Sequence, residues 1–319
     1  MAADVHCPAT AAQGVRVTVG VASYNRPELL RRAIRSAVSQ TYKNLEILIS
    51  DNGSPNPEVR RVIEEFARSD TRIRCIFHPV NQGAFFNFRS VLTEANGQYF
   101  VWLADDDYWC SEYLESLLAE AQRTGAALTY GRAEIVDIEI AERDRFVKEL
   151  PTTIGRLPAL INFVRFDTDS IFYGLFPTAT GKKLVELLRT WRVPKTMAAA
   201  YPFLEYNFVS YAFVFGLLSS GGFCNERSGK AIHYAGGREP FSNSPSVGWR
   251  HLGLFIAYVL IHLQMVARFI RATFAVGSGL GVVASPIAAL YFFCRRMSMI
   301  VFQRLKRLRK DGHECKTKI

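Results

Sequence analysis

The chain has 319 residues, of which 49% are hydrophobic and 21% charged, which indicates a globular protein with a substantial core. Its six cysteines are scattered, with no CxxC pair and no His/Cys cluster, which argues against a zinc site or a disulfide framework and favours a reducing compartment. The net charge of +10 is concentrated near the C-terminus, where residues 295–319 hold nine Lys or Arg against two Asp or Glu. A basic tail beside an apolar stretch favours a membrane surface over nucleic acid as the partner.

Residues 1–14 are expected to form a flexible tail, because residues 1–13 have neither the basic start nor the apolar core of a signal peptide. Strand and helix patterns then alternate up to residue 130. The predicted strands cover residues 15–21, 45–50, 73–77 and 99–104. The predicted helices have Pro27 in the first opening turn, Asn56 and Pro57 as a cap on the second, Phe85, Phe88, Leu92 and Ala95 in the third, and Ser111 as a cap on the fourth. This alternation predicts an α/β fold with a largely parallel sheet and helices on both faces.

Polar residues follow each predicted strand, and in a parallel sheet the carboxyl ends of the strands meet at the edge where ligands bind. Asn, Asp and Gly also favour ordinary turns, so any one of these groups has a simpler interpretation. Four groups on one edge indicate a binding site. They are Ser23, Tyr24 and Asn25 after the first strand, Asp51 and Asn52 after the second, Asn81, Gln82 and Gly83 after the third, and Asp105, Asp106 and Asp107 after the fourth.

The three adjacent aspartates need a cation. Two like charges about 4 Å apart cost roughly 1 kcal/mol in water and several times more near a protein surface. The hydrophobic run at residues 99–104 places the triplet at the end of a buried strand. The simplest cation for oxygen ligands at such a position is a divalent metal, Mg²⁺ or Mn²⁺.

These motifs resemble the family 2 glycosyltransferases with a GT-A (Rossmann-like) fold. The first strand and its loop read VGVASYNRP at 19–27, and the second strand with its approach reads SQTYKNLEILISDNGS at 39–54. The approach to the metal-binding DXD motif corresponds to NQG at 81–83 and ANGQYFVWLADDD at 95–107. The resemblance covers roughly residues 15–121, weakens over 132–246 and is absent beyond.

The resemblance implies a nucleotide-diphosphate sugar as the donor, most simply a UDP-sugar, and an inverting transfer. Ser23, Tyr24 and Asn25 would line the nucleotide site together with Asn81, Asp51 would accept a hydrogen bond from the base, and Asp105 would lie near the ribose and diphosphate. Asp105, Asp106 and Asp107 would supply the metal ligands. Because Ala104 occupies the place where the usual motif starts, either Asp105 and Asp107 form the pair, or Asp106 is the closest ligand with Asp105 assisting, which is the assignment we favour.

The acceptor hydroxyl needs a general base. The family supplies a carboxylate from the second half of the domain, often at the start of a helix, and Glu205 stands in a similar place in a helical pattern over residues 201–216. Asp167 and Asp169 are rivals for this role, and Glu205 also fits a surface position. The Gln-x-x-Arg-Trp motif of polymer-forming members is missing, which favours the transfer of one sugar per encounter.

The expected organisation is a nucleotide-sugar-binding half at residues 15–130, an acceptor-binding half at 131–246 and a membrane-associated helical region at 247–319. Residues 272–294 carry no charge, a length that spans a bilayer. Basic residues on both flanks favour a hairpin, a re-entrant helix or an in-plane anchor over a single span, and residues 295–310 fit an interfacial helix. A soluble C-terminal bundle or dimerisation helices stay open as alternatives.

The sequence therefore predicts a metal-dependent glycosyltransferase at the cytoplasmic face of a membrane. Its acceptor would be a lipid-linked or surface glycan, nucleic acid is not an expected partner, and a homo-oligomer stays open. One alternative is a sugar nucleotidyltransferase, which normally needs a Gly-rich basic phosphate loop that residues 19–27 do not provide. The other is a non-catalytic membrane protein that binds sugar nucleotides, against which the intact acidic triplet counts.

Overall fold

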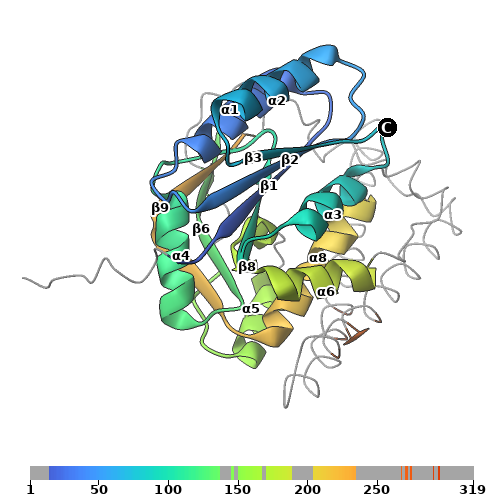
Figure 1. Ribbon diagram of the computed structural model, residues 1–319. Helices are drawn as coiled ribbons and strands as arrows, with labels where there is room; N and C mark the ends of the chain where they lie inside the picture. Colours follow the sequence, from blue (N-terminus) through green and yellow to red (C-terminus); the bar gives the residue numbers. More distant parts are fainter. Residues whose placement is uncertain are drawn as a thin grey trace, which may run out of the picture.

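The computed structural model describes residues 14–136, 145–146, 150–166, 170–188 and 204–234, together with positions 267, 270, 271, 274, 290 and 294. A five-stranded sheet with the order β3-β2-β1-β4-β8 forms its centre (Figure 1). Four strands are parallel, and the short β8 is antiparallel to β4. Their bounds are Val17–Ser23 for β1, Leu45–Asp51 for β2, Ile73–Phe77 for β3, Tyr99–Ala104 for β4 and Phe176–Pro177 for β8.

The register of the parallel strands brings three loops to one edge of the sheet. Strand β1 lies between β2 and β4, with Ser23 opposite Asp51 and Ala22 opposite Ala104. The three strands therefore end almost level with one another. The loops that follow them must share the carboxyl edge, where ligands of parallel α/β sheets bind.

Alternating side chains supply a separate core on each face of the sheet. Val17, Val19 and Val21 belong to one core, which is covered by α1 (Pro27–Val38), α2 (Pro57–Ser69) and α4 (Tyr113–Thr124). The opposite core contains Leu48, Phe100 and Trp102. It is covered by α3 (Ala84–Glu94), α5 (Arg156–Phe166), α6 (Thr178–Leu188) and α8 (Leu204–Ser220), of which α3, α6 and α8 lie together in Figure 1.

Aromatic side chains dominate the second core. The ring of Trp102 stacks on Phe172 of the short 3₁₀ helix η1 (Ser170–Tyr173), with a centroid distance of 4.2 Å and an interplanar angle of 8°. Phe176 and Phe213 pack against Trp102 at 5.2 and 5.0 Å. Each fully buried aromatic ring of this kind stabilises the fold by about 1.5–3 kcal/mol through burial alone. The core thus joins β4 to elements that come more than sixty residues later in the chain.

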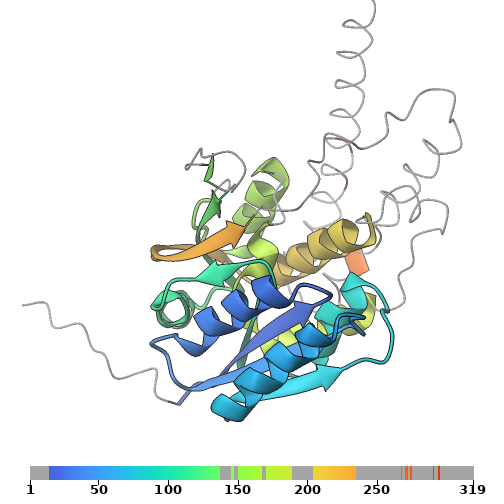
Figure 2. The ribbon, with the colours of Figure 1, turned by 90° about the horizontal axis from the view of Figure 1, so that it is seen from above.

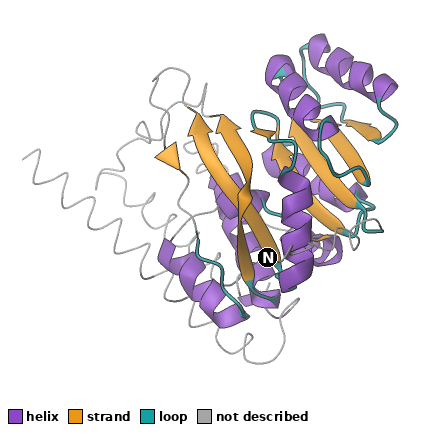
Figure 3. Ribbon diagram, turned by 90° about the vertical axis from the view of Figure 1, so that its left-hand side faces the viewer, coloured by secondary structure: helices purple, strands orange, loops and turns teal. Residues whose placement is uncertain are grey.

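A second sheet has the order β5-β9-β6-β7, with β5 at Tyr108–Trp109, β6 at Leu128–Val136, β7 at Arg145–Phe146 and β9 at Phe223–Tyr234. The long strands β6 and β9 are parallel and run side by side (Figures 2 and 3). Strand β5 begins directly after the three aspartates and pairs antiparallel with β9, Tyr108 opposite Ile232. The second sheet therefore anchors the chain immediately beyond the acidic triplet.

The four predicted strands, their parallel arrangement and the helices on both faces are confirmed. Asn56 caps α2 as predicted, since its Oδ1 accepts a hydrogen bond of 3.0 Å from the Glu58 N–H. The predicted cap at Ser111 is wrong. Helix α4 starts one residue later than that cap would place it, with Glu112 at the N-cap position and no side-chain capping bond, because residues 111–112 still belong to the turn after β5.

Two further details differ from the sequence expectation. The first strand starts at Val17 and runs two residues further than predicted, to Ser23. In α3 the fully enclosed positions are Asn87, Val91 and Leu92, whereas Phe85 and Phe88 pack only partly buried against the core. The first strand is therefore shifted by two residues, because Ala22 still pairs with β2 and β4, and Ser23 with β2.

Residues 1–13 of the predicted tail at 1–14 lie outside the described residues, as do the rivals Asp167 and Asp169 and almost all of residues 247–319. In the part of the chain that the structure describes, no helix is both long enough and apolar enough to cross a membrane.

Candidate active site

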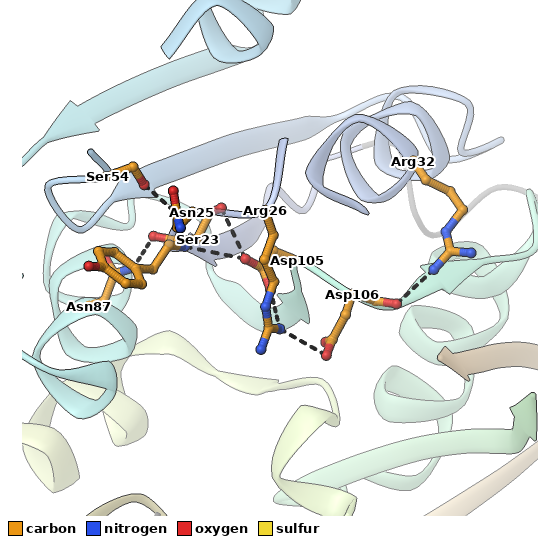
Figure 4. Close-up of polar contacts among 9 residues, drawn as sticks. Ser23, Asn25, Arg26, Arg32, Ser54, Asn87, Asp105 and Asp106 are labelled. Atoms are coloured by element: carbon orange, nitrogen blue, oxygen red, sulfur yellow. Dashed lines mark hydrogen bonds and ion pairs between the residues drawn. The ribbon is translucent and has the colours of Figure 1, made fainter. Parts of the chain in front are cut away.

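The loop after β1 turns sharply at the carboxyl edge of the sheet. Asn25 has a φ of 60°, in the left-handed region, which Asn tolerates better than most residues. Its N–H donates to Ser54 Oγ at 2.8 Å, so the loop after β2 fixes the turn (Figure 4). The turn delivers Arg26 to the N-cap of α1, where Pro27 starts the helix.

Asp105 lies at the centre of the contacts made by this turn. Its carboxylate is buried and accepts hydrogen bonds from Ser23 Oγ at 3.0 Å, from the Tyr24 N–H at 3.3 Å and from Arg26 Nη1 at 3.2 Å. Burial raises the pKa of Asp105 to about 6, with the nearby charge of Asp106 adding to the rise, while Arg26 and the bonds from Ser23 and Tyr24 oppose it. Desolvation exceeds the stabilisation that the three donors give to the charged form.

Arg26 holds two of the three aspartates at once. The same atom, Nη1, donates to Asp105 Oδ1 at 3.2 Å and to Asp106 Oδ2 at 3.0 Å. Figure 4 shows the guanidinium reaching toward both carboxylates. The side chain of Arg26 is 43% exposed, whereas those of Asp105 and Asp106 are 10% and 3% exposed. The cation that the acidic triplet requires is therefore, in this structure, an arginine of the first loop.

The backbone of the triplet forms a turn held by a second arginine. The Asp107 N–H donates to the Ala104 carbonyl at 3.1 Å, and Arg32 Nη2 donates to the Asp106 carbonyl at 2.9 Å. The guanidinium of Arg32 also lies over the ring of Tyr108, 4.5 Å from its centroid. Arg26 at the N-cap of α1 thus holds the side chains of Asp105 and Asp106, and Arg32 within α1 holds the main chain of Asp106.

Asp51 and the loop after β2 form the other side of the site. Asp51 is 6% exposed, and its Oδ1 accepts hydrogen bonds from the N–H of Ser54 at 3.1 Å and from Ser54 Oγ at 2.5 Å. Gly53 has a φ of 70°, and a Cβ there would lie 2.6 Å from the carbonyl carbon of Val80. The backbone of this loop therefore packs directly on the loop after β3.

Asn52 ties those two loops together. Its Nδ2 donates to Asn81 Oδ1 at 2.9 Å and to the Gly83 carbonyl at 3.1 Å, while its Oδ1 accepts from the Gln82 N–H at 3.0 Å. Asn81 Oδ1 also accepts from the Gly83 N–H at 2.9 Å. In this structure Asn81 holds the loop in shape at the carboxyl edge.

Two of the residues that hold this edge together, Arg26 and Asn87, were given no role by the sequence analysis. Arg26 stands inside the motif at 19–27, yet nothing local shows that it reaches a strand 79 residues further on. Asn87 links β1 to β2 from α3, because its Nδ2 donates to the carbonyls of Ser23 and Ser50 at 3.0 and 3.3 Å. A polar residue amid the apolar positions of the predicted third helix was the available signal for Asn87.

The predicted base is only partly placed. Glu205 lies in the first turn of α8, as a carboxylate at the start of a helix, and its side chain is outside what the structure describes. The other predicted residues, Ser23 to Asn25, Asp51, Asn81 and the acidic triplet, come together along the carboxyl edge through the contacts given above.

Comparison with known proteins assigns the chain to a family. The family model described as Glycosyl transferase family 2 matches residues 18–192, more than half of the chain. The chain belongs to glycosyltransferase family 2. The match includes the loops after β1, β2 and β3, the acidic triplet and the strands that position them, so the resemblance inferred from the motifs is confirmed.

Curated relatives of this family 2 glycosyltransferase match over its N-terminal part. A Campylobacter jejuni protein named GalNAc(5)-diNAcBac-PP-undecaprenol beta-1,3-glucosyltransferase is 32% identical over 121 residues, covering 38% of this chain and 38% of its own. The Escherichia coli protein named UDP-Glc:alpha-D-GlcNAc-diphosphoundecaprenol beta-1,3-glucosyltransferase WfgD is 29% identical over 121 residues, covering 38% of this chain and 47% of its own. The chain thus spans less than half the length of these relatives.

Solved structures share the fold. The crystal structure of S. aureus TarS 1-349 superposes with a TM-score of 0.56 at 12% identity, covering 87% of this chain and 89% of that chain. The same protein in complex with UDP gives a TM-score of 0.54 at 14% identity over 81% of this chain and 69% of that chain. At this identity the similarity establishes the fold, which is the mostly parallel α/β arrangement expected of GT-A enzymes.

Proposed function

We propose that this family 2 glycosyltransferase moves one sugar from a UDP-sugar to a hydroxyl of a lipid-linked glycan, with inversion and with the help of Mg²⁺ or Mn²⁺. The observation that carries the proposal is the buried carboxylate pair of Asp105 and Asp106, which faces the loop after β1 and is bridged by the guanidinium of Arg26 from that loop. The names of the two relatives include undecaprenol-linked acceptors, and one includes UDP-Glc as donor. Membership in the family favours sugar transfer over the alternative of a nucleotidyltransferase.

The acidic triplet has the donor chemistry for a hard divalent metal. Mg²⁺ is usually held by one or two carboxylates together with substrate phosphates, whereas all-protein sites need more ligands. Among the residues that the structure describes, no group of three or more His, Cys, Asp or Glu side chains is placed to hold a metal ion. A two-carboxylate site that the diphosphate completes fits this arrangement, with Asp106 as the closest ligand and Asp105 assisting, or with Asp105 and Asp107 as the pair. When bound, the metal would offset the negative charge that develops on the leaving diphosphate.

The chain's own residues would bind and orient the donor. Ser23, Tyr24 and Asn25 would contact the nucleotide along the first loop, and Asp51 would accept a hydrogen bond from the base. Asn81 would position the loop after β3 against the nucleotide. The hydrogen bonds from Ser23 and Tyr24 hold the Asp105 carboxylate in place before a donor arrives, which lowers the cost of ordering it on binding.

Glu205 would act as the general base. Its carboxylate would take the proton of the acceptor hydroxyl while the oxygen attacks the anomeric carbon, and the bond from that carbon to the diphosphate oxygen would break. Attack on the face opposite the leaving group inverts the configuration. The apolar and basic region at 247–319 would keep the enzyme on the cytoplasmic face of the membrane, next to a lipid-linked acceptor, and a homo-oligomer is compatible with this placement.

The test is a donor and acceptor screen with purified protein, a panel of UDP-sugars and a synthetic lipid-diphosphate-linked N-acetylglucosamine. We expect UDP release that depends on both acceptor and Mn²⁺. Asp106→Ala and Glu205→Gln should each lower the rate of UDP release by at least 100-fold, with the melting temperature unchanged. Glu64→Gln, in an exposed pair with Arg60, is the matched control and should keep full activity. Release of pyrophosphate in place of UDP, or full activity of both site variants, would refute the assignment.

A further inference from the structure

Arg26 occupies the position between two carboxylates where a divalent cation would be expected. Its Nη1 donates to Asp105 at 3.2 Å and to Asp106 at 3.0 Å. The carboxylates are 10% and 3% exposed, so the positive charge of Arg26 compensates them where water cannot.

We propose that Arg26 is a displaceable counter-ion that couples metal binding to donor binding. This inference rests on the function proposed above. In the ligand-free protein Arg26 neutralises part of the charge of Asp105 and Asp106, which keeps their affinity for a metal low. When the donor binds, Arg26 moves from the carboxylates to the diphosphate, and the freed carboxylates take the metal.

The position of Arg26 permits this exchange. Its side chain is 43% exposed and starts from the N-cap of α1, so its guanidinium can move without opening either core. The two aspartates are anchored independently of Arg26. Asp105 is held by Ser23 and Tyr24, and the main chain of Asp106 is held by Arg32.

The charges favour the same order of events. A metal that entered beside Arg26 would be repelled by the guanidinium at close range. A diphosphate adds negative charge and offers Arg26 phosphate oxygens, for which a planar guanidinium forms strong bidentate hydrogen bonds. The nucleotide and the metal therefore strengthen each other's binding, and by linkage the coupling must be equal in both directions.

Two other roles for Arg26 make different predictions. If the pair only stabilises the fold, removing Arg26 lowers stability and leaves metal binding unchanged. If Arg26 replaces the metal altogether, nucleotide binding needs no metal and collapses in an Arg26 variant.

The experiment measures Mn²⁺ binding by electron paramagnetic resonance, which detects free Mn²⁺ directly, with and without UDP. The variants are Arg26→Gln and Arg26→Lys. Arg31→Gln is the matched control, since Arg31 lies on the same helix and pairs at 2.8 Å with Glu65, outside the contacts of the acidic triplet. Thermal unfolding of each protein verifies that it is folded.

In the wild type we expect weak Mn²⁺ binding alone and at least tenfold tighter binding with saturating UDP. Arg26→Gln should bind Mn²⁺ roughly tenfold more tightly without UDP, because a repulsion of about 1.4 kcal/mol between Arg26 and the metal is gone. Adding UDP should tighten Mn²⁺ binding less in Arg26→Gln than in the wild type, because the diphosphate then contributes only its own metal ligands. Arg26→Lys should restore weak binding, and Arg31→Gln should behave as the wild type does.

Unchanged or weaker Mn²⁺ binding by folded Arg26→Gln, while the wild type still binds UDP and Mn²⁺ together, would overturn the inference and leave the proposed function intact. UDP binding that needs no metal in the wild type and is lost in Arg26→Gln would also overturn it, in favour of Arg26 as a metal substitute. Absence of any UDP or Mn²⁺ binding by the wild type would overturn both.

Discussion

Replacing Glu46 by glutamine is expected to destabilise the fold by about 2–3 kcal/mol without changing the chemistry of the site. Glu46 is fully buried near the amino end of β2. Its carboxylate accepts hydrogen bonds from Thr18 Oγ1 at 2.6 Å, Arg74 Nη1 at 2.5 Å, and the N–H and Nδ2 of Asn96 at 2.8 and 2.9 Å. Both carboxylate oxygens of Glu46 accept hydrogen bonds, so in a glutamine the NH₂ group would replace one of these acceptors and would face donors with which it cannot bond.

The magnitude follows from the pKa of Glu46. Burial by itself would raise this pKa, but the hydrogen bonds from Thr18, Asn96 and Arg74 outweigh it and lower the value from 4.5 to about 2. A pKa that is about 2.5 units lower in the folded state than in the unfolded state corresponds to about 3 kcal/mol of folding free energy. The side chain of Arg74 is 45% exposed, so solvent screens its share and we expect about 2–3 kcal/mol.

The pH dependence has a definite sign. Because the folded-state pKa is lower than the unfolded one, the contribution is complete above about pH 4.5 and is lost as the pH falls toward 2. Urea unfolding of wild type and Glu46→Gln should therefore differ most at pH 6–8 and converge in acid. Residue 46 lies about 17 Å along the strand from Asp51, so kcat of the folded variant at low temperature should equal that of the wild type.

The control for Glu46 is Glu64→Gln. Glu64 pairs with Arg60 at 2.8 Å on the surface of α2 and is 42% exposed, so its loss should change the free energy of unfolding by less than about 0.5 kcal/mol. A loss below about 1 kcal/mol for Glu46→Gln at pH 7, or a difference from wild type that grows in acid, would refute the reasoning.

Three further predictions concern the turn of the acidic triplet, the loop after β2 and the cap of α2. Arg32→Met removes the hydrogen bond to the Asp106 carbonyl and should lower the free energy of unfolding by about 1 kcal/mol. Calorimetry should show about tenfold weaker binding of UDP with Mn²⁺. Unchanged affinity would contradict the role of Arg32 in fixing the turn. Gly53→Ala should lower the free energy of unfolding by about 2–3 kcal/mol, measured in urea. Gly125→Ala, also at positive φ but without a nearby atom, should cost only about 1 kcal/mol. Equal costs would show that the contact of Gly53 with the loop after β3 is unimportant. Asn56→Ala removes the cap of α2 and should cost about 1 kcal/mol by thermal unfolding, with donor affinity unchanged; a loss of affinity would mean that α2 has a part in the site.

Local patterns in the sequence were sufficient for the elements of the nucleotide-binding half. The period-two valines of the first strand and the helical spacing of Leu114, Leu117 and Leu118 report which residues of an element share a side, and these residues all lie in one core. Asn56 acts through a hydrogen bond to Glu58, two residues away, and Pro57 through its own fixed φ, so their effect on α2 is readable locally. Ser111 shows the limit of such reading, because the turn after β5 continues through the position where its pattern predicted a cap.

What the sequence by itself determined was that three carboxylates stand at the end of a buried strand and need a cation. Only the tertiary structure decided which cation of the chain meets them. Ser23 and Arg26 reach Asp105 across 82 and 79 residues, because β1 and β4 are neighbours in the sheet and end at the same level. Strand order and register depend on pairing between distant segments, and no local periodicity records that pairing.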